Sequence, residues 1–418
     1  MDNNEDYKID KEDVSLGMLN KEEEKKEMFS EGDSFTEKFV KRLIIVAVES
    51  GASDIFFEPQ EEDMRVRLRV DGLLCEAESC SVKYSSSIVS YIKVISSLDI
   101  AEHRFPQDGR FRMQINSKPV DFRVSVIATN LGEKVVLRVL DKGNIKLDLD
   151  TLSFDTQSIE VLKANLRKPY GMIIVCGPTG SGKTTTLYSA LNYIDSVDIN
   201  IVTVEDPVEY QISGVNQVAA NEQIGLTFAS ALRSILRQDP DVIMIGEIRD
   251  IDTADIAVKA SLTGHLVLST IHATTATGAI VRFINMGIEP FLMASSCLAT
   301  AAQALLRKLC PDCKVETDIP DNIEEIFNLS NISFQQDLKY YKAGGCRFCN
   351  NIGYKGRIGL IEILVVDSDI KELLNRGAAD MEIKSVAIAN GMKTLRDKAL
   401  LQILKGDTTM EEVLRVTI

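Results

Sequence analysis

The segment of this 418-residue sequence with the clearest chemistry is a glycine-rich loop that precedes a predicted helix. Two glycines separated by four residues are followed by Lys and Thr, and an apolar run over 172–176 comes just before them. Backbone N–H groups of such a loop surround phosphate oxygens, and the positive end of the following helix, predicted over 185–193, attracts the same anion. We therefore expect nucleotide to be bound by Gly177, Pro178, Thr179, Gly180, Ser181, Gly182, Lys183, Thr184 and Thr185.

Two residues of this loop have individual roles in that interpretation. Lys183 supplies a positive charge for the β- and γ-phosphates of a nucleoside triphosphate. The hydroxyl of Thr184 can ligate Mg²⁺. The sequence therefore predicts a magnesium–nucleotide site.

Carboxylates that could act on the nucleotide follow two other apolar runs. Glu247 ends the run 241–246, and we expect it to orient or deprotonate a water; Gly246 stands where this motif usually has Asp. The carboxyl ends of parallel strands meet at one edge of a sheet, so these acids should approach the loop. The second apolar run is followed by Glu205, Asp206 and Glu209, which could hold metal-bound waters. For any one of these three acids, a helix cap or a solvated turn remains the alternative.

Two of the three histidines bracket one predicted strand. His265 and His272 flank the apolar run 266–270. For each of them, direct sensing of phosphate and an ordinary polar position are both open. His103 lies in a polar segment and is interpreted as incidental.

Four cysteines form two C-x-x-C pairs separated by 32 residues. Paired knuckles in a chain without an export signal indicate structural zinc, whereas a redox dithiol would need only one pair. Structural zinc can contribute about 10–16 kcal/mol to folding, so we expect a subdomain over 307–357 that depends on the metal. The predicted ligands are Cys310, Cys313, Cys346 and Cys349.

Arginines are frequent in the first half of the chain. Arg65, Arg67 and Arg69 alternate along one predicted strand, while Arg110 and Arg123 lie near predicted turns and strands. Arginine suits desolvated phosphate charge, and phosphate-loop motors often need an arginine from a neighbouring subunit. A solvated charged face or internal ion pairs remain the alternative for each of them.

The pattern of elements predicts an α/β protein with several parts. Residues 35–141 mix helices and strands in a small α+β domain, and polar residues 142–154 are typical of a linker. Residues 155–418 alternate short apolar strands with helices, as in a parallel sheet covered on both faces. The final sixty residues are predicted to be rich in helix.

Charge and hydropathy exclude several classes of protein. Residues 1–33 hold twelve acidic residues and five lysines, so this predicted flexible tail (1–34) carries −7 of the net charge of −15. Acidic balance argues against nucleic acid as a partner. The most apolar long window, 290–306, contains several polar residues and is interpreted as a buried helix rather than a membrane span. No basic start with an apolar run is present, so we expect the chain in the cytoplasm.

Together these motifs resemble one family, the type II secretion and type IV pilus assembly ATPases. The similarity extends from about residue 35 to residue 418, and Phe56 departs from it because the family usually has His there. The segments that carry the resemblance are 52–55, 69–72, 106–110 and 132–136 in the first domain, and 205–210, 246–250, 263–272, the four cysteines and 353–357 in the second.

The resemblance implies a RecA-like ATPase domain with a smaller PAS-like N-terminal domain and a tetracysteine zinc subdomain. It implies a homo-hexamer that hydrolyses ATP, with Glu247, Lys183 and Glu205 catalytic and Arg110 and Arg123 reaching a neighbouring nucleotide. It also implies a motor at the inner face of the cell membrane, attached only through partners, that drives an inner-membrane platform protein to assemble a pilus or secretion pseudopilus. A retraction motor, a nucleotide-dependent switch or scaffold, and a DNA-translocating motor are the alternatives.

Overall fold

The chain forms two compact units, Met1–Ile145 and Lys146–Ile418. The computed structural model describes residues 34–140, 147–320, 323–330, 332–334 and 339–417, and the backbone of 14–16. The predicted acidic tail therefore lies outside the described residues except for a short strand, β1 (Val14–Leu16), and Ser34. The first part of the predicted linker, 142–146, also lies outside them.

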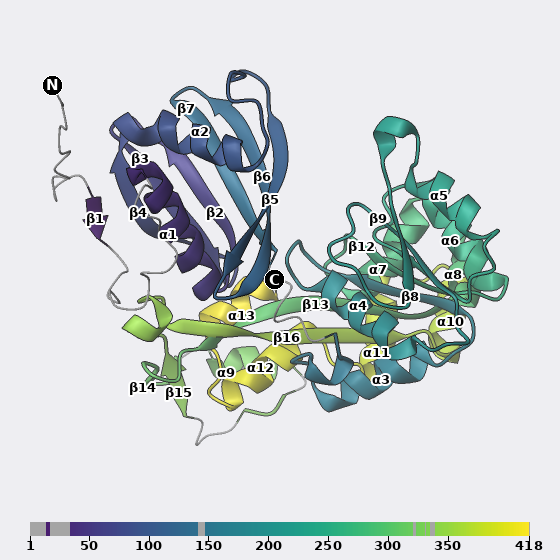
Figure 1. Ribbon diagram of the computed structural model, residues 1–418. Helices are drawn as coiled ribbons and strands as arrows, with labels where there is room; N and C mark the ends of the chain where they lie inside the picture. The colour runs from purple at the N-terminus through teal and green to yellow at the C-terminus, as the bar shows by residue number, and fades with distance from the viewer. Residues whose placement is uncertain are drawn as a thin grey trace, which may run out of the picture. The chain divides into compact units, whose positions relative to one another are not determined.

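The first unit is an antiparallel sheet with two helices packed on one face (Figure 1). Helix α1 (Phe35–Glu49) begins where the Ser34 side chain accepts a hydrogen bond from the N–H of Glu37, and it buries an apolar face against the sheet. The order of strands is β1-β4-β3-β2-β7-β6-β5. The other elements are β2 (Ala52–Pro59), β3 (Asp63–Val70), β4 (Leu73–Ser81), α2 (Ser85–Ile95), β5 (Gln107–Ile115), β6 (Lys118–Thr129) and β7 (Gly132–Leu140).

The second unit is built on a seven-stranded sheet in the order β10-β9-β11-β12-β8-β13-β16. All neighbouring strands are parallel except the last pair, and separate apolar clusters on its two faces are covered by helices. The strands are β8 (Gly171–Cys176), β9 (Ile201–Glu205), β10 (Val215–Ala219), β11 (Val242–Ile245), β12 (Leu266–Ile271), β13 (Cys297–Leu309) and β16 (Tyr354–Val365).

Ten α-helices, counted among the described residues outside the tetracysteine segment, complete the second unit. They are α3 (Thr156–Leu166), α4 (Lys183–Ile194), α5 (Phe228–Ile235), α6 (Ile251–Leu262), α7 (Ala276–Asn285), α8 (Pro290–Ser296), α10 (Ser368–Asn375), α11 (Asp380–Ala389), α12 (Leu395–Leu404) and α13 (Met410–Val416). Short 3₁₀ helices span Val82–Tyr84 (η2), Leu149–Thr151 (η3), Glu222–Ile224 (η4) and Arg347–Cys349 (η5).

The structure corrects one prediction, the single buried helix over 290–306. Helix α8 ends at Ser296, and the residues that follow form β13, which pairs with β8 on one side and β16 on the other. Both faces of this strand are largely covered, so apolar residues occupy most of its positions without a two-residue alternation, and such a run does not separate a strand from a helix.

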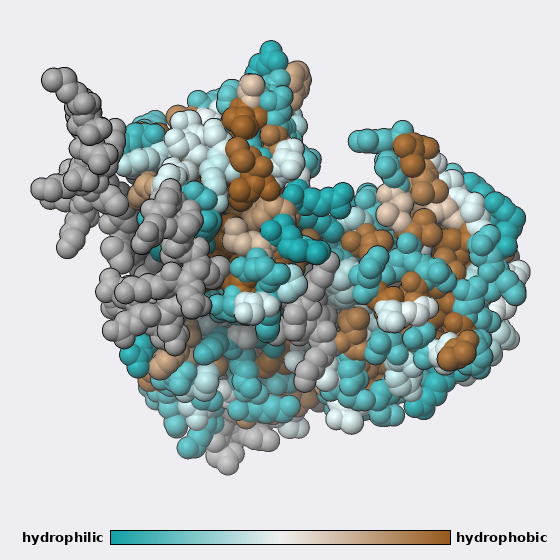
Figure 2. Space-filling model, in the orientation of Figure 1, coloured by the Kyte–Doolittle hydropathy of each residue, from teal (hydrophilic) through white to brown (hydrophobic). Residues whose placement is uncertain are grey.

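No helix among the described residues has the length and apolar character that a span requires. On the face drawn in Figure 2, hydrophobic side chains lie in limited areas between hydrophilic ones.

Candidate functional site

The glycine-rich loop joins β8 to α4 at the carboxyl edge of the second sheet. Gly182 precedes α4 in a left-handed conformation (φ +89°), and Gly180 has a φ of +79°, which suits glycine. No side chain caps the start of α4, whereas Thr or Asp side chains cap α5, α6 and α7. The N–H groups of the first turn are therefore left to a ligand, which fits the predicted phosphate.

The side chain of Lys183 folds back over the loop. Its Nζ donates hydrogen bonds to the carbonyl oxygens of Gly177 (2.9 Å) and Pro178 (3.0 Å). Burial lowers the pKa of Lys183, and the nearby charge of Glu247 opposes that shift. Thr184 is exposed in the first turn of α4, and Thr185 hydrogen-bonds Tyr210. The predicted phosphate-binding lysine and the strand-end glutamate thus lie at the same edge of the sheet.

Glu247 comes directly after β11 and Gly246, and its carboxylate lies beside an arginine and a histidine. One oxygen forms an ion pair with Arg249, and the other lies 3.4 Å from Nε2 of His272. A Cβ at position 246 would lie 3.3 Å from the Cα of Glu205 and 3.4 Å from the carbonyl oxygen of Val204. The close passage of β9 therefore leaves little room for a side chain at position 246.

The acids after β9 have unequal surroundings. Glu205 is buried and accepts hydrogen bonds from Tyr188, Thr203 (2.6 Å) and Gln217 (3.1 Å). Burial and the Glu205 carboxylate raise the pKa of Tyr188, so that phenol stays a donor. The carboxylate of Glu205 is thus occupied by three protein donors.

The other two acids of this segment are more accessible. Asp206 is exposed and precedes a cis peptide bond to Pro207, while Glu209 is half-buried and its N–H donates to the Tyr188 hydroxyl. These two carboxylates are therefore better placed than Glu205 to hold waters of a metal ion.

The structure separates the two predicted histidines. His272 follows the carboxyl end of β12, but His265 precedes its amino end, where Nδ1 lies 3.0 Å from the carbonyl oxygen of Ala260. His265 and His272 are seven residues apart on an extended segment that rises about 3.3 Å per residue, so roughly 23 Å separates their backbone positions along the strand. Within one chain His265 does not join the phosphate loop, and its predicted role toward phosphate stays a prediction.

Arginines of the first unit form a row across its sheet. Register places Arg69, Asp54, Arg138, Arg123 and Arg110 side by side on five neighbouring strands. The buried carboxylate of Asp54 lies 3.0 Å from Nε of Arg138 and 3.7 Å from Nε of Arg69. The two predicted arginine fingers are therefore neighbours on the sheet face opposite α1 and α2, and Arg110 is exposed.

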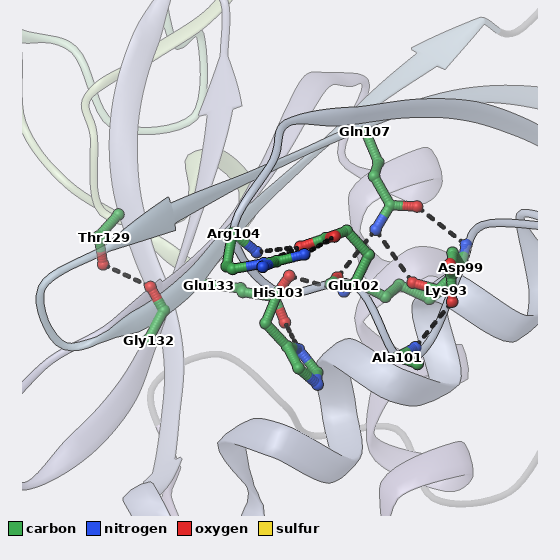
Figure 3. A network of polar contacts seen from close by, with 10 residues as sticks. All are labelled: Lys93, Asp99, Ala101, Glu102, His103, Arg104, Gln107, Thr129, Gly132 and Glu133. Carbon is green, nitrogen blue, oxygen red and sulfur yellow. Dashed lines mark hydrogen bonds and ion pairs between the residues drawn. The ribbon is translucent and has the colours of Figure 1, made fainter.

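A polar network fixes the loop that leads into the strand of Arg110 (Figure 3). The buried ammonium of Lys93 contacts the carbonyl oxygen of Glu102 at 2.7 Å and the carboxylate of Glu133 at 2.6 Å. Nδ1 of His103, a residue assigned no role from the sequence, lies 2.8 Å from the same carboxylate of Glu133. The amide side chain of Gln107 hydrogen-bonds the backbone of both Asp99 and Glu102 and so links the two sides of the loop. These contacts order the start of β5 three residues before Arg110.

The four predicted metal ligands meet in the second unit. Their sulfur atoms all lie within 4.8 Å of one another, and the closest pairs are 3.7–3.9 Å apart. A tetrahedral zinc ion with Zn–S bonds of about 2.3 Å needs sulfur atoms about 3.8 Å apart, so the cluster fits zinc. The cysteines are free thiols and form no disulfide.

The backbone around the two C-x-x-C pairs is arranged to fit a metal site. Burial raises the pKa of the Cys349 thiol, but N–H groups of Cys346 and Gly353 outweigh it and lower that pKa to about 7. A Cβ on Gly344 would lie 2.1 Å from the carbonyl oxygen of Cys313, which requires glycine there. Between the knuckles lie β14 (Val315–Thr317), α9 (Ile323–Asn328) and β15 (Tyr340–Lys342), so the segment has its own small fold.

Sequence reasoning assigned no role to three residues at this edge. Arg249 was recognised only as part of a motif, while Tyr188 and Gln303 lie inside helical or apolar runs. Arg249 contacts Glu247, Tyr188 contacts Glu205, and Gln303 contacts the phosphate loop. The one signal for Gln303 was its amide in a run that is otherwise mostly apolar.

Comparison with known proteins identifies similar sequences over nearly the whole chain. The model of the family "Type II/IV secretion system protein" matches residues 30–415. The chain is 49% identical over 381 residues to the type IV pilus assembly ATPase PilB of Myxococcus xanthus, covering 90% of this chain and 67% of that protein. It is 47% identical to the type II secretion system protein E of Aeromonas hydrophila, covering 91% and 75%.

Solved structures share the fold. The pilus retraction motor PilT with bound ADP superimposes with a TM-score of 0.59 at 25% identity, over 90% of this chain and 96% of that one. The ATPase DotB of Legionella pneumophila gives a TM-score of 0.67 at 20% identity, over 93% and 98%. The observed layers are thus those of a known group of ATPase folds.

Proposed function

Because the chain belongs to the type II/IV secretion system protein family, we propose that it is an ATP-hydrolysing motor that powers filament assembly. The filament is a type IV pilus or a type II secretion pseudopilus. The motor is a homo-hexamer at the inner face of the cell membrane, and it acts on an inner-membrane platform protein. It reaches the membrane only through its partners and binds no nucleic acid.

One observation carries the hydrolase proposal: the phosphate loop and Glu247 share the carboxyl edge of one sheet. The negative charge of Glu247 acts on the ammonium of Lys183 and opposes the lowering of its pKa by burial. In the proposed reaction Lys183 binds the β- and γ-phosphates, and water attacks the γ-phosphorus while the Glu247 carboxylate accepts its proton. The bond from the γ-phosphorus to the β,γ-bridging oxygen breaks, and ADP and inorganic phosphate leave. His272 lies beside the Glu247 carboxylate, and in this proposal it senses the γ-phosphate.

Two metals belong to the proposal. The Thr184 hydroxyl, with waters held by Asp206 and Glu209, would hold Mg²⁺, which neutralises phosphate charge when bound. The four cysteines would hold Zn²⁺, whose contribution is to the stability of the subdomain and not to catalysis. The fit of the sulfur distances to a tetrahedron supports the second assignment.

The arginine row supports an active site completed by a neighbouring subunit. In this proposal Arg110 and Arg123 reach the nucleotide of the adjacent chain and stabilise charge on the transferred phosphoryl group. The ordered loop before β5 leads to Arg110 on the sheet face opposite α1 and α2.

The tetracysteine segment and the named pilus-assembly relative favour assembly over retraction. Deletion in the source cell distinguishes them, because loss of an assembly motor leaves no filaments and loss of a retraction motor leaves more. Steady-state phosphate release by the purified oligomer distinguishes a motor from a switch. Many turnovers per chain, unchanged by added DNA, support the proposal; a single stoichiometric turnover favours the switch, and stimulation by DNA favours a translocating motor.

A further inference from the structure

A polar side chain on β13 forms hydrogen bonds with the phosphate loop and with helix α4. Gln303 is 3% exposed and lies in a strand whose other buried residues are mostly apolar. Its amide nitrogen donates to the carbonyl oxygen of Ser181 at 2.9 Å, and its amide oxygen accepts from the hydroxyl of Thr186 at 2.9 Å. One side chain thus ties the loop and helix α4 to the neighbouring strand.

The backbone of the same residue explains two of the loop glycines. A Cβ on Gly177 would lie 2.3 Å from the carbonyl oxygen of Gln303, and a Cβ on Gly182 would lie 3.0 Å from its amide nitrogen. Gly180, by contrast, has open space around it and needs glycine only for its backbone angles. The absence of a side chain at the first and last glycines of the motif therefore lets β13 lie close behind the loop, in addition to leaving space for a phosphate.

These contacts set the direction of the loop's peptide groups. Strand register aligns Ala302 with Cys176, so Gln303 lies opposite the first loop residue. When the carbonyl of Ser181 is held toward the core, the N–H of Gly182 in the same planar peptide group points the opposite way, where it can face the anion. The hydrogen bond from Thr186 fixes the first turn of α4, whose N–H groups complete the cradle.

We propose that Gln303 is a positioning residue for nucleotide binding, which orients the phosphate loop and α4 without touching the ligand. The inference rests on the proposed function only in that the loop binds ATP. A buried amide that served packing alone would stabilise the fold equally with and without nucleotide. Gln303 should instead affect the affinity for ATP in protein that is fully folded.

The test is the dissociation constant of a fluorescent ATP analogue with Mg²⁺, measured for Gln303→Met and Gln303→Glu. Gln303→Met removes both buried hydrogen bonds and should weaken binding about 10- to 100-fold. Gln303→Glu keeps an oxygen that accepts from Thr186 but cannot donate to Ser181, and it should weaken binding as well. Gln238, which is exposed on a turn of the same unit, supplies the control Gln238→Glu, and it should bind like the unmodified chain. Zinc content and thermal unfolding without nucleotide report whether each variant is folded.

Thr186 provides an independent variant at the other end of the contact. Thr186→Val should weaken binding by a smaller factor, Thr186→Ser should restore it, and Gln303→Met combined with Thr186→Val should bind no more weakly than Gln303→Met alone. If Gln303→Met does not fold, Thr186→Val and Thr186→Ser carry the test. Folded variants with unchanged affinity would overturn this inference, whereas failure of the unmodified chain to bind ATP would overturn the proposed function instead.

Discussion

The carboxylate of Glu247 is paired with the guanidinium of Arg249, two residues further along the chain. The hydrogen bond to Glu247 raises the pKa of Arg249, and the negative charges of Asp206 and Glu222 raise it further. Arg249 therefore orients the proposed base toward the site while it lies among several acids.

Removal of that guanidinium should impair the chemical step. Arg249→Gln should lower kcat about 10-fold, because Glu247 loses the partner that orients it, and should leave the affinity for ATP within about threefold. Phosphate release and nucleotide binding measured on the same preparation check this. An unchanged kcat would show that the pair has no part in turnover.

The arginines of the first unit should act between subunits. Arg123→Ala and Lys183→Ala should each be inactive alone, and mixed rings should recover activity because an intact Arg123 can face an intact phosphate loop on another chain. Arg376→Ala, an exposed arginine paired with Glu382 in the second unit, serves as the control and should be active alone. Mixtures no more active than either parent would contradict action in trans.

The cysteine cluster should hold one zinc ion per chain. Cys349→Ser should lose the metal and lower the thermal midpoint of unfolding by several degrees, since the knuckles and the segment between them depend on it. Cys75→Ser, in the first unit, should keep both metal and stability. Metal analysis that finds well under one zinc per chain in the unmodified protein would refute the assignment.

The ion pairs of Glu412 make a stability contribution that depends on pH. Burial raises the pKa of this carboxyl, but hydrogen bonds from Arg415 and Arg307 outweigh it and lower the pKa to about 2. Its ordinary value is 4.5, so the contribution is present above pH 4.5 and is lost as the pH falls toward 2.

Glu412→Gln should therefore cost on the order of 3 kcal/mol of unfolding free energy near neutral pH. The difference from the unmodified chain should shrink to nearly zero by pH 2. Circular dichroism during denaturation is the suitable measurement, because the chain contains no Trp. A difference that stays constant across this range would contradict the role given to the ion pairs.

Local signals in the sequence predicted much of this structure. The run 172–176 followed by the glycine loop located β8 and α4, and paired cysteine spacing located the metal centre. The strand β13 was missed because burial on both faces removes the alternation that marks a strand. Short motifs identify chemistry best when their residues are close in sequence.

Contacts between distant residues could not be predicted in this way. Gln303 meets the loop only because β13 is inserted beside β8, and Asp54 meets Arg138 across two strands far apart in the chain. Sheet order and strand direction decide these relationships.

The central claim is tested most directly by Glu247→Gln. This variant keeps the shape of the side chain but cannot accept the proton of the attacking water. Its turnover of ATP should fall at least about 100-fold while its dissociation constant for ATP stays near that of the unmodified chain. Turnover at the unmodified rate would contradict the account.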